Sequence, residues 1–522
     1  MGDESWRVRK EAVDAFLTGA MDEERMEMLV AMLASQDNAG LRNSAVEALE
    51  RLGNLAVPVL SLHMDEDDHD VRKFVVDILG NIGDAAAVPL LIKALDDRDP
   101  NVSAAAAENL GKIADPGSIP HLVQTLAKND LWLRFTVLEA LCRIGKPMPV
   151  DVVVPLLGEN LLKKAVFDCI GAIGGADSIP FLLHGLHEKA RSARDAAITA
   201  LIKVRERLPA ELASELVDTR LRDLAVSPFV ELLLSALDGA DTDVKEAIVR
   251  MLGLIGDHRA AVPLVHGCRD ERLRKHCLEA LEIIGEAGMA SLIDAFTAAD
   301  DQQRCAIAYV CGEMRHGGCA PLLREGMRSS SSSELRKISV SAAGKAGLTQ
   351  LVDDIVLMLD NGAPEEQDAA IAALSRLAEG DRASVIRVAA ELAGAKSSEK
   401  RHSSAMLFAA LKDDDKLSLL VKDEDAMVRK AAVASLAAMK SSGCVPHLVM
   451  ALADEDADVR SAVAGAFGEI GGDVVFEPLL LALKDEDSWV KCAALRSLGR
   501  LRSEKALPAI IEALETAQGL EL

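Results

Sequence analysis

Histidine and cysteine, the side chains that most often bind zinc in proteins, are densest in residues 258–319. The members of this window are His258, His266, Cys268, His276, Cys277, Cys305, Cys311, His316 and Cys319. Metal ligands recur at close helical spacing, whereas Cys277 and Cys311 fall on the apolar positions of a repeated helical pattern. A buried thiol behaves as a small hydrophobic group, so we interpret this window as core packing, with a zinc site as the alternative. We predict no catalytic residue, no metal and no cofactor.

Composition and charge exclude several other classes of function. The formal net charge is −25, which disfavours nucleic-acid binding because phosphate neutralisation needs clustered lysine and arginine. No apolar run approaches the roughly 20 residues that span a bilayer. The nine cysteines are odd in number and include no C-x-x-C pair, which indicates reduced thiols. These features predict a cytoplasmic protein without a membrane segment.

One sequence pattern recurs along almost the whole chain. It reads ADEDADVRSAVAGAFGEIG at 453–471, DEDDHDVRKFVVDILGNIG at 65–83 and KDEDSWVKCAALRSLGRL at 484–501. Each copy has an acidic turn, a helix cap, Val-Arg and then apolar residues at the spacing of one helix face. Aligned on Val-Arg, the copies give a basic column whose arginines include Arg72, Arg274, Arg304, Arg336, Arg401, Arg429 and Arg460. The residue four positions earlier is a good cap in most copies, from Ser5 and Asp68 to Asp487, with Glu159 assigned to the same column.

Each of these longer helices, which we call B helices, follows a shorter A helix that often opens with proline. Pro58, Pro89 and Pro120 mark such openings, and the repeat of about 31 residues suits two helices and two short turns. Glycine recurs eight residues after the basic position, as in Gly80, Gly312 and Gly499. Because glycine costs about 1 kcal/mol inside a helix, its recurrence predicts close approach between B helices.

A helical hairpin of this size cannot bury its apolar face alone, so neighbouring hairpins must stack. The D-x-D-x-x-V-R turn, the A-x-x-A-L-G-x-I-G helix and the V-P-x-L helix resemble the HEAT-like repeat, particularly the short type of the phycobilin lyases. The predicted fold is all-α: a right-handed α-solenoid of about sixteen HEAT-like hairpins. We expect N-terminal repeats over 1–204, an extra inter-repeat helix over 205–226 and C-terminal repeats over 227–522, irregular in 350–420.

The resemblance leaves function open, because helical arrays serve many roles. Deoxyhypusine hydroxylases hold iron with several His-Glu dipeptides, and this chain has one, His187-Glu188. Phycobilin lyases are much shorter, and no Cys–His–acid cluster here is assigned to a bilin. DNA-glycosylase-like HEAT proteins use a basic concave face, which the net charge disfavours.

The arginine column and the tryptophans invite a binding role, but packing explains them more simply. Each column arginine lies four residues after a cap, so we interpret the pair as an i, i+4 contact that stacking extends into a ladder. Trp132 and Trp489 lie near helix starts, where packing against the next repeat is expected. The serine run that follows Arg328 predicts a flexible loop.

The positions that vary between copies are better candidates for function. Position +5, counted from the basic residue, should face outward, on the concave side if the HEAT resemblance holds. In the first six repeats it is always acidic, and the residues are Asp14, Glu47, Asp77, Glu108, Glu139 and Asp168. Salt bridges to lysine and arginine on the same helices are one interpretation of this row. A groove for a basic peptide is the other.

Later repeats carry other residues at position +5. Tyr309, the only tyrosine, and Met406 stand there among small residues such as Ala373 and Gly465, which would admit an apolar helix. We therefore predict a non-enzymatic scaffold or adaptor that binds a protein or peptide, basic in character, on the concave face. The alternative is an accessory or lyase-type factor acting on a cofactor-bearing protein. We expect a monomer, with head-to-tail association as the alternative, because the chain starts at a B helix and finishes on an A helix at 507–517.

Overall fold

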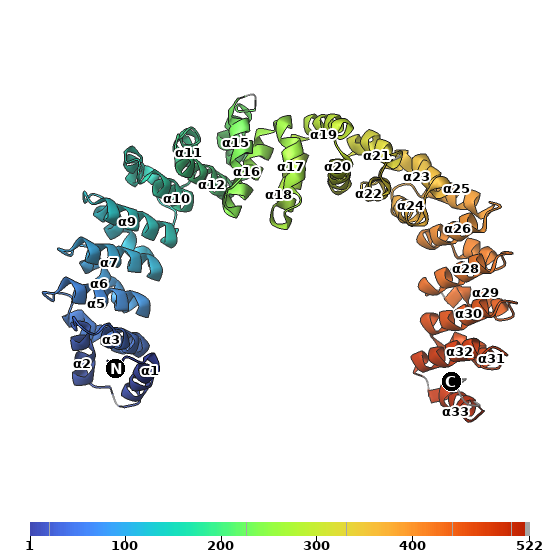
Figure 1. Ribbon diagram of the computed structural model, residues 1–522, viewed down its shortest axis with the longest axis horizontal. Helices are drawn as coiled ribbons and strands as arrows, with labels where there is room; N and C mark the ends of the chain where they lie inside the picture. Colours follow the sequence, from blue (N-terminus) through green and yellow to red (C-terminus); the bar gives the residue numbers. More distant parts are fainter. Residues whose placement is uncertain (20, 226, 330, 441, 503, 517–522) are drawn as a thin grey trace. The chain divides into compact units, whose positions relative to one another are not determined.

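The computed structural model of the protein describes residues 1–19, 21–225, 227–329, 331–440, 442–502 and 504–516. The chain forms two compact units, residues 1–257 and 258–522. Within each unit, helices follow one another as antiparallel A–B hairpins, so the predicted all-α solenoid is confirmed (Figure 1). Among the described residues, no helix combines the length and the apolar composition needed to cross a bilayer.

Unit 1 contains a layer of long B helices and a layer of short A helices. The B helices are α1 (Trp6–Leu17), α3 (Ala39–Leu52), α5 (His69–Ile82), α7 (Pro100–Ile113), α9 (Leu131–Ile144), α10 (Lys163–Ile173), α12 (Arg191–Arg207) and α16 (Thr242–Ile255). The A helices are α2 (Glu23–Leu33), α4 (Val57–Leu62), α6 (Val88–Ala94), α8 (Ile119–Thr125), α11 (Ile179–Gly185) and α15 (Phe229–Ala236). Before α10 the A position is a 3₁₀ turn, Val154–Gly158.

Unit 2 repeats this arrangement. Its B helices are α18 (Glu271–Ile284), α20 (Asp301–Met314), α22 (Ser333–Lys345), α24 (Pro364–Leu377), α26 (Ser398–Leu411), α28 (Ala426–Ala438), α30 (Ala457–Ile470) and α32 (Ser488–Leu501). Its A helices are α17 (Ala261–Gly267), α19 (Glu286–Ala298), α21 (Ala320–Met327), α23 (Val352–Asn361), α25 (Arg382–Ala393), α27 (Asp414–Leu420), α29 (Val445–Ala451), α31 (Phe476–Ala482) and α33 (Leu507–Thr516). Residue 517 of the predicted last helix lies outside the described residues.

Two stretches singled out in the sequence take a definite form. The predicted extra helix contains α13 (Ala210–Ala213), a π-helical turn (Ser214–Asp218) and α14 (Thr219–Arg222), after α12 has continued to Arg207. This segment lies inside unit 1, and residue 226 is outside the described residues. Residues 350–420 form the ordinary hairpins α23–α24 and α25–α26 and the helix α27, although their sequence signatures are weak.

Helix starts follow the predicted caps closely. The Asp68 carboxylate accepts the Asp70 backbone N–H at 2.9 Å, and Asp487 caps α32 in the same way. Each satisfies an N–H group that the helix leaves without an internal partner. Glu159, which stands in this column by register, caps no helix, because α10 begins only at Lys163. The longer turn before α10 moves the helix start away from that column.

Glycines in the B helices sit where two helices touch. A Cβ on Gly111 would lie 2.7 Å from the Ala140 Cα, and one on Gly312 would lie 2.8 Å from the Ala342 Cα. The predicted close approach is therefore confirmed at these positions, and Gly499, where a Cβ would meet nothing within 4 Å, is an exception. The B helices are closely spaced, and the layer that they form lies on the inner side of the curve within each unit (Figure 1).

The arginine column joins repeats, but through partners other than the predicted ones. Arg72 does not pair with its cap Asp68; its Nε and Nη2 donate to both carboxylate oxygens of Asp97, in the next repeat, at 2.8 Å. Its Nη1 donates to the Glu66 and Asp67 carbonyls. The i, i+4 interpretation is wrong because the cap carboxylate faces its own helix N-terminus, whereas the guanidinium points to the following turn.

The same arginine–aspartate contact between consecutive repeats recurs in unit 2, and we call each such contact a rung. Arg401 pairs with Asp423, Arg429 with Asp454 and Arg460 with Asp485, each through two hydrogen bonds of 2.7–2.9 Å. In each Asp-Glu-Asp turn the first aspartate thus binds the preceding arginine, and the last caps its own helix. The middle glutamate also approaches that arginine, as in the 3.0 Å contact between Arg401 and Glu424.

These rungs bury charge and shift its ionisation. Burial opposes ionisation of Asp454, but hydrogen bonds from Arg429 and from the Asp456 N–H outweigh it and lower the pKa of the carboxyl. The same balance lowers the pKa of Asp97. Bidentate arginine–carboxylate contacts are geometrically specific, so these rungs fix how consecutive hairpins stack.

Candidate partner-binding surface

The acidic row lies on one face of consecutive B helices in unit 1. Its members come from α1, α3, α5, α7, α9 and α10, and each side chain is exposed or half-buried. Helical periodicity places position +5 opposite the residues that pack on the A helices. The outward orientation predicted for this row is therefore what the six side chains have.

Most carboxylates of the acidic row have a basic partner nearby. Asp14 and Glu47 approach Arg51 at 2.6 and 3.6 Å. The i, i+4 pairs on the later helices are Lys73–Asp77 (2.8 Å), Glu108–Lys112 (3.1 Å) and Lys164–Asp168 (2.8 Å). Such exposed pairs contribute little stability, about 0.3–0.5 kcal/mol each, and can be exchanged for contacts with a partner.

Glu139 differs from the rest of the row. It is exposed, and within the described residues no lysine, arginine or histidine nitrogen lies within 4 Å of its carboxylate. The charge of Glu139 contributes, after that of Asp168, to raising the pKa of Lys164 on the neighbouring helix α10. The fifth position of the acidic row thus keeps a carboxylate that is not held by an ion pair to any described residue.

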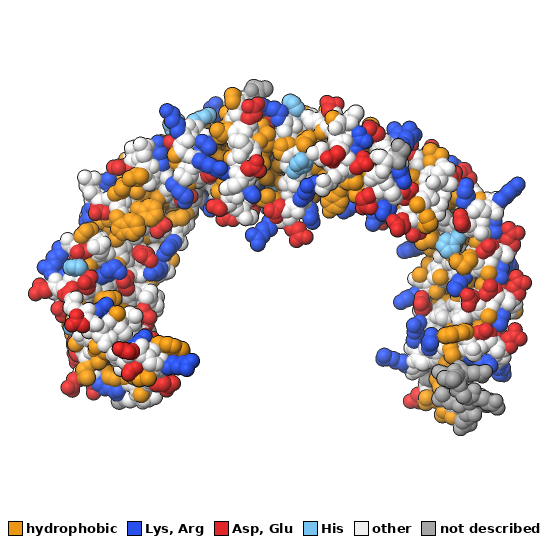
Figure 2. Space-filling model, viewed as in Figure 1, with side chains coloured by type: hydrophobic (Ala, Val, Ile, Leu, Met, Phe, Trp, Pro, Cys, Tyr) orange, Lys and Arg blue, Asp and Glu red, His pale blue; other side chains and the backbone are white. Residues whose placement is uncertain are grey.

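An exposed apolar cluster lies at the start of α9 and in the turn before α10. We call Leu131, Trp132, Phe135 and Leu161 the Trp132 cluster; Trp132 is 63% exposed and Leu161 78%. The Trp132 and Phe135 rings stack on one helix with centroids 5.7 Å apart. Figure 2 shows hydrophobic side chains gathered over α9. The expectation that Trp132 packs against the next repeat is wrong.

The expectation that Trp489 packs against the next repeat is also wrong. Its side chain is 69% exposed at the start of α32, although its backbone carbonyl lies 3.5 Å from the Ser461 hydroxyl. Trp132 and Trp489 both stand two residues before the basic position. At that position on the first turn of a B helix, the side chain points away from the A helices, a signal already present in the repeat register.

The later +5 residues form a different surface in unit 2. Tyr309 is exposed and lines a depression of about 420 Å³ with Gly312, Ile338, Ser341 and Ala342 of α20 and α22. Met406 is also exposed, and a Cβ on Gly465 would meet open space. Ala373 is fully buried because Gly344 packs directly on it, so it does not belong to the predicted floor.

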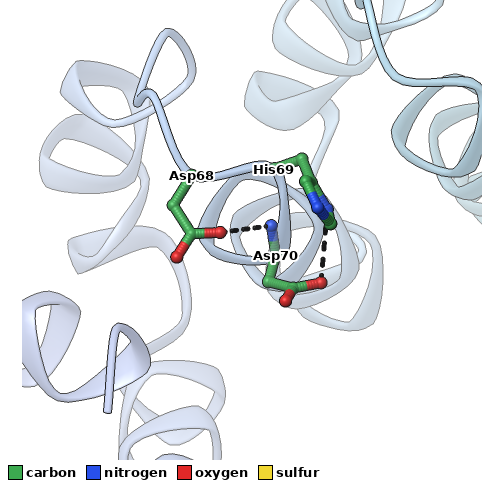
Figure 3. A group of neighbouring side chains, drawn as sticks. All are labelled: Asp68, His69 and Asp70. Carbon is green, nitrogen blue, oxygen red and sulfur yellow. Dashed lines mark hydrogen bonds and ion pairs between the residues drawn. The ribbon is translucent and has the colours of Figure 1, made fainter. Parts of the chain in front are cut away.

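One acidic group has the spacing of a metal site. Asp68, His69 and Asp70 at the start of α5 have potential ligand atoms within 4.8 Å of one another, uniquely among the described residues. Figure 3 shows the Asp68 carboxylate turned to the Asp70 backbone N–H, and the His69 Nδ1 lies 3.3 Å from the Asp70 carboxylate. This is the arrangement of a helix cap with two exposed neighbours, and we assign it to capping.

The cysteine-rich window packs as the repeat register predicts. Cys277 and Cys311 are fully buried in the B helices α18 and α20, and Cys268 and Cys319 are buried beside them. A hydrogen bond that the Cys277 thiol donates to Cys268, together with burial, raises the pKa of Cys277. A thiol held in its protonated form is a poor nucleophile and metal ligand.

Comparison with known proteins agrees with this architecture. The family model of HEAT repeats matches residues 56–140, 120–202, 415–481 and 445–521. Stacked helical hairpins with this turn and helix pattern define an α-solenoid, and the chain is a HEAT-repeat protein. The subtype suggested by the lyase resemblance stays a prediction.

Several solved structures match most of the chain at low identity and low TM-score. Importin beta crystallised in ammonium sulfate is 13% identical, with 96% of this chain and 81% of that chain covered and a TM-score of 0.37. Importin beta crystallised in polyethylene glycol is 12% identical, covering 98% and 90%, with a TM-score of 0.39. Kap95p, in a study of its binding to RanGDP, is 13% identical, covering 94% and 73%, with a TM-score of 0.39. No curated protein matches the chain in sequence.

Proposed function

We propose that the protein is a non-catalytic scaffold whose unit 1 binds a basic, amphipathic segment of a partner protein. The binding surface would be the outward face of α7, α9 and α10. The observation that carries the proposal is the Trp132 cluster, an exposed apolar group at the start of α9 and before α10, two helices with an acidic residue in the middle. Such a surface fits a helix that has apolar side chains on one stripe and lysine or arginine beside it.

The apolar part supplies the driving force for binding. Burying apolar surface contributes roughly 25 cal/mol per Å², and tryptophan is the residue most enriched at interface positions that dominate binding energy. Trp132 already stacks on Phe135, so its ring is held in place before a partner arrives. Less side-chain entropy is then lost on association.

The acidic part supplies charge selectivity. Glu108, Glu139 and Asp168 lie on three consecutive B helices, and Glu139 forms no ion pair with any described residue that it would have to give up. A partner lysine near Glu139 gains attraction without breaking a contact, and the exposed pairs beside it exchange at small cost. The overall charge of −25 attracts basic partners at long range.

Tryptophan fluorescence tests this proposal on the full chain. Replacing Trp6 and Trp489 with phenylalanine leaves Trp132 as the single tryptophan. The probe is an acetylated peptide of about 18 residues with leucine and lysine at helical spacing, and its comparison peptide has glutamate in place of lysine. The lysine peptide should shift Trp132 emission to shorter wavelength, and the glutamate peptide should leave it unchanged.

A charge-matched pair of variants separates a specific surface from general attraction. Reversing Glu108, Glu139 and Asp168 to lysine should weaken binding of the lysine peptide at least about tenfold, or 1.4 kcal/mol. Reversing the exposed acids Glu24, Glu211 and Glu215 changes the net charge equally and should have little effect. Equal weakening by both sets would refute the proposed surface.

A further inference from the structure

The turn between α21 and α22 departs from the rung pattern of unit 2. In the Asp-Glu-Asp turns at 423–425, 454–456 and 485–487, the first aspartate and the glutamate approach the arginine of the preceding repeat. At the corresponding register before Arg336 the sequence is Ser330-Ser331-Ser332, and residue 330 lies outside the described residues. Ser331 stands where Glu424, Glu455 and Glu486 stand in those turns.

Arg304, the column arginine before this turn, binds carbonyl groups in place of a carboxylate. Its Nε and Nη2 donate to the Phe296 and Thr297 carbonyls at 2.8 and 2.9 Å. The guanidinium carbon also lies 5.4 Å from the centre of the Phe296 ring. In the described part of the chain, Arg304 has no carboxylate within 4 Å, so this rung has no acidic partner.

Two further arginines surround the same place. Arg304, Arg324, Arg328, Ser329 and Ser331 line a depression of about 450 Å³ together with Pro321 and Glu325. The buried Asp354 receives Arg324 Nε at 2.8 Å and Arg328 Nη2 at 2.6 Å. One carboxylate therefore orients two guanidinium groups. Arg324 Nη2 also donates to the Gln350 carbonyl at 3.4 Å, and the remaining N–H donors of both groups are available to an anion.

We propose that Ser331 is a phosphorylation site whose phosphate monoester is bound by Arg304, Arg324 and Arg328. A protein serine kinase would supply the phosphoryl group from ATP. The Ser331 Oγ bonds to the γ-phosphorus, the bond to the β-phosphate oxygen breaks, ADP leaves, and the hydroxyl proton passes to the kinase base. The modified turn then presents to Arg304 the anion that the Asp-Glu-Asp turns present elsewhere.

The surroundings of Ser331 suit this change. The residue is exposed, and its hydroxyl contacts Asp301 at 3.0 Å and the Ser329 hydroxyl at 3.1 Å. The added charge of nearly −2 repels Asp301, so the phosphate turns toward the arginines. Serines contribute no charge to this turn, whereas three acids are tolerated in each closed turn. The N-terminus of α22, two residues away, favours an anion as well.

Incorporation of phosphoserine at position 331 of the full chain tests the proposal by hydrogen exchange. Amides of residues 297–304 and 332–340 should exchange about tenfold more slowly than in the unmodified chain, because new charge-assisted bonds tie the two hairpins together. In an Arg304→Gln, Arg328→Gln background the slowing should fall below about twofold. Equal slowing in that background would overturn the proposal.

Two further experiments test whether the slower exchange requires a phosphate at position 331 and all three arginines. Ala299 stands at the equivalent position one repeat earlier, where the column arginine is Arg274 and there are no counterparts of Arg324 and Arg328. Phosphoserine in place of Ala299 should therefore slow amide exchange far less. Equal protection at position 299 would mean that any turn phosphate acts alike, which overturns the three-arginine site. Inorganic phosphate added to the unmodified chain should have little effect; full protection by it would assign the depression to a free anion instead.

Discussion

Two junctions between repeats of unit 2 are held by different contacts, one by a buried ion pair and the other by a close helix–helix contact at a glycine. At the junction of α28 and α30, Arg429 and Asp454 form a buried bidentate pair at 2.7 and 2.8 Å, and Ala437 stands where other helices have glycine. At the junction of α20 and α22 no such pair forms among the described residues. There Gly312 lets the two helices touch, because a Cβ at this position would lie only 2.8 Å from the Ala342 Cα.

The difference shows that the ion pair in the turn and the glycine contact between the helices contribute separately to the stacking of repeats. Elsewhere both contacts occur together, as at α30 and α32, where Arg460 binds Asp485 and Gly468 packs on Ser497. A repeat array distributes its stability over its units and the interfaces between neighbours. A junction with a single such contact should therefore be sensitive to loss of that contact alone.

Removal of the Arg429 side chain should give the largest effect. Breaking a buried ion pair leaves Asp454 without its cation and costs about 3–5 kcal/mol. Arg304→Ala, at the other junction, removes hydrogen bonds to carbonyls that water can replace and should cost about 1 kcal/mol. Urea unfolding of both variants measures the difference.

The exposed Lys430 provides the control for this pair of variants. Its ammonium lies 3.7 Å from the Asp458 carboxylate, and Lys430→Ala should cost less than about 0.5 kcal/mol. Equal costs for Arg429→Ala and Arg304→Ala would show that the two junctions do not differ in the way described.

An added methyl group should destabilise the chain at the seam between α20 and α22 but not on the outward face of α30. Gly312→Ala forces α20 and α22 apart, because the new Cβ meets backbone, and should cost about 1–3 kcal/mol. Gly465→Ala on α30 places its Cβ in open space and should stabilise the chain by about 0.5–1 kcal/mol through helix propensity. Thermal unfolding of the two variants distinguishes the signs, and stabilisation by Gly312→Ala would contradict the seam.

Acid should weaken the rung junction selectively. The folded-state pKa of Asp454 lies below its unfolded value of about 3.9. Its contribution is therefore complete above about pH 4 and is lost as the pH falls through the folded pKa. Urea midpoints from about pH 6 to pH 3 should fall less steeply in Asp454→Asn than in the parent. In Arg304→Ala the urea midpoint should fall with pH as steeply as in the parent. If the midpoint of Asp454→Asn also fell as steeply as that of the parent, Asp454 would not contribute to the acid sensitivity.

Much of the candidate surface could be predicted from the repeat register. Position +5 generally lies across the helix from the packed residues, so the acidic row and the exposure of Tyr309 and Met406 followed from spacing. Ala373, which is buried against Gly344, is the exception. The pairing of Glu108 with Lys112 was also expected. Exposure of Trp132 and Trp489 was missed, because a large aromatic residue suggests packing unless its register position is weighed against its type.

The sequence by itself determined the period, the hairpin fold, most helix starts and the glycine contacts. Each depends on residues close in the chain, or on one pattern repeated at fixed spacing. Only the tertiary structure decided which carboxylate each arginine binds. Asp68 and Asp97 are both near Arg72 by repeat arithmetic, but the cap carboxylate already accepts a backbone N–H, and stacking brings the next turn to the guanidinium. The open rung at Ser331 became visible only against those closed ones.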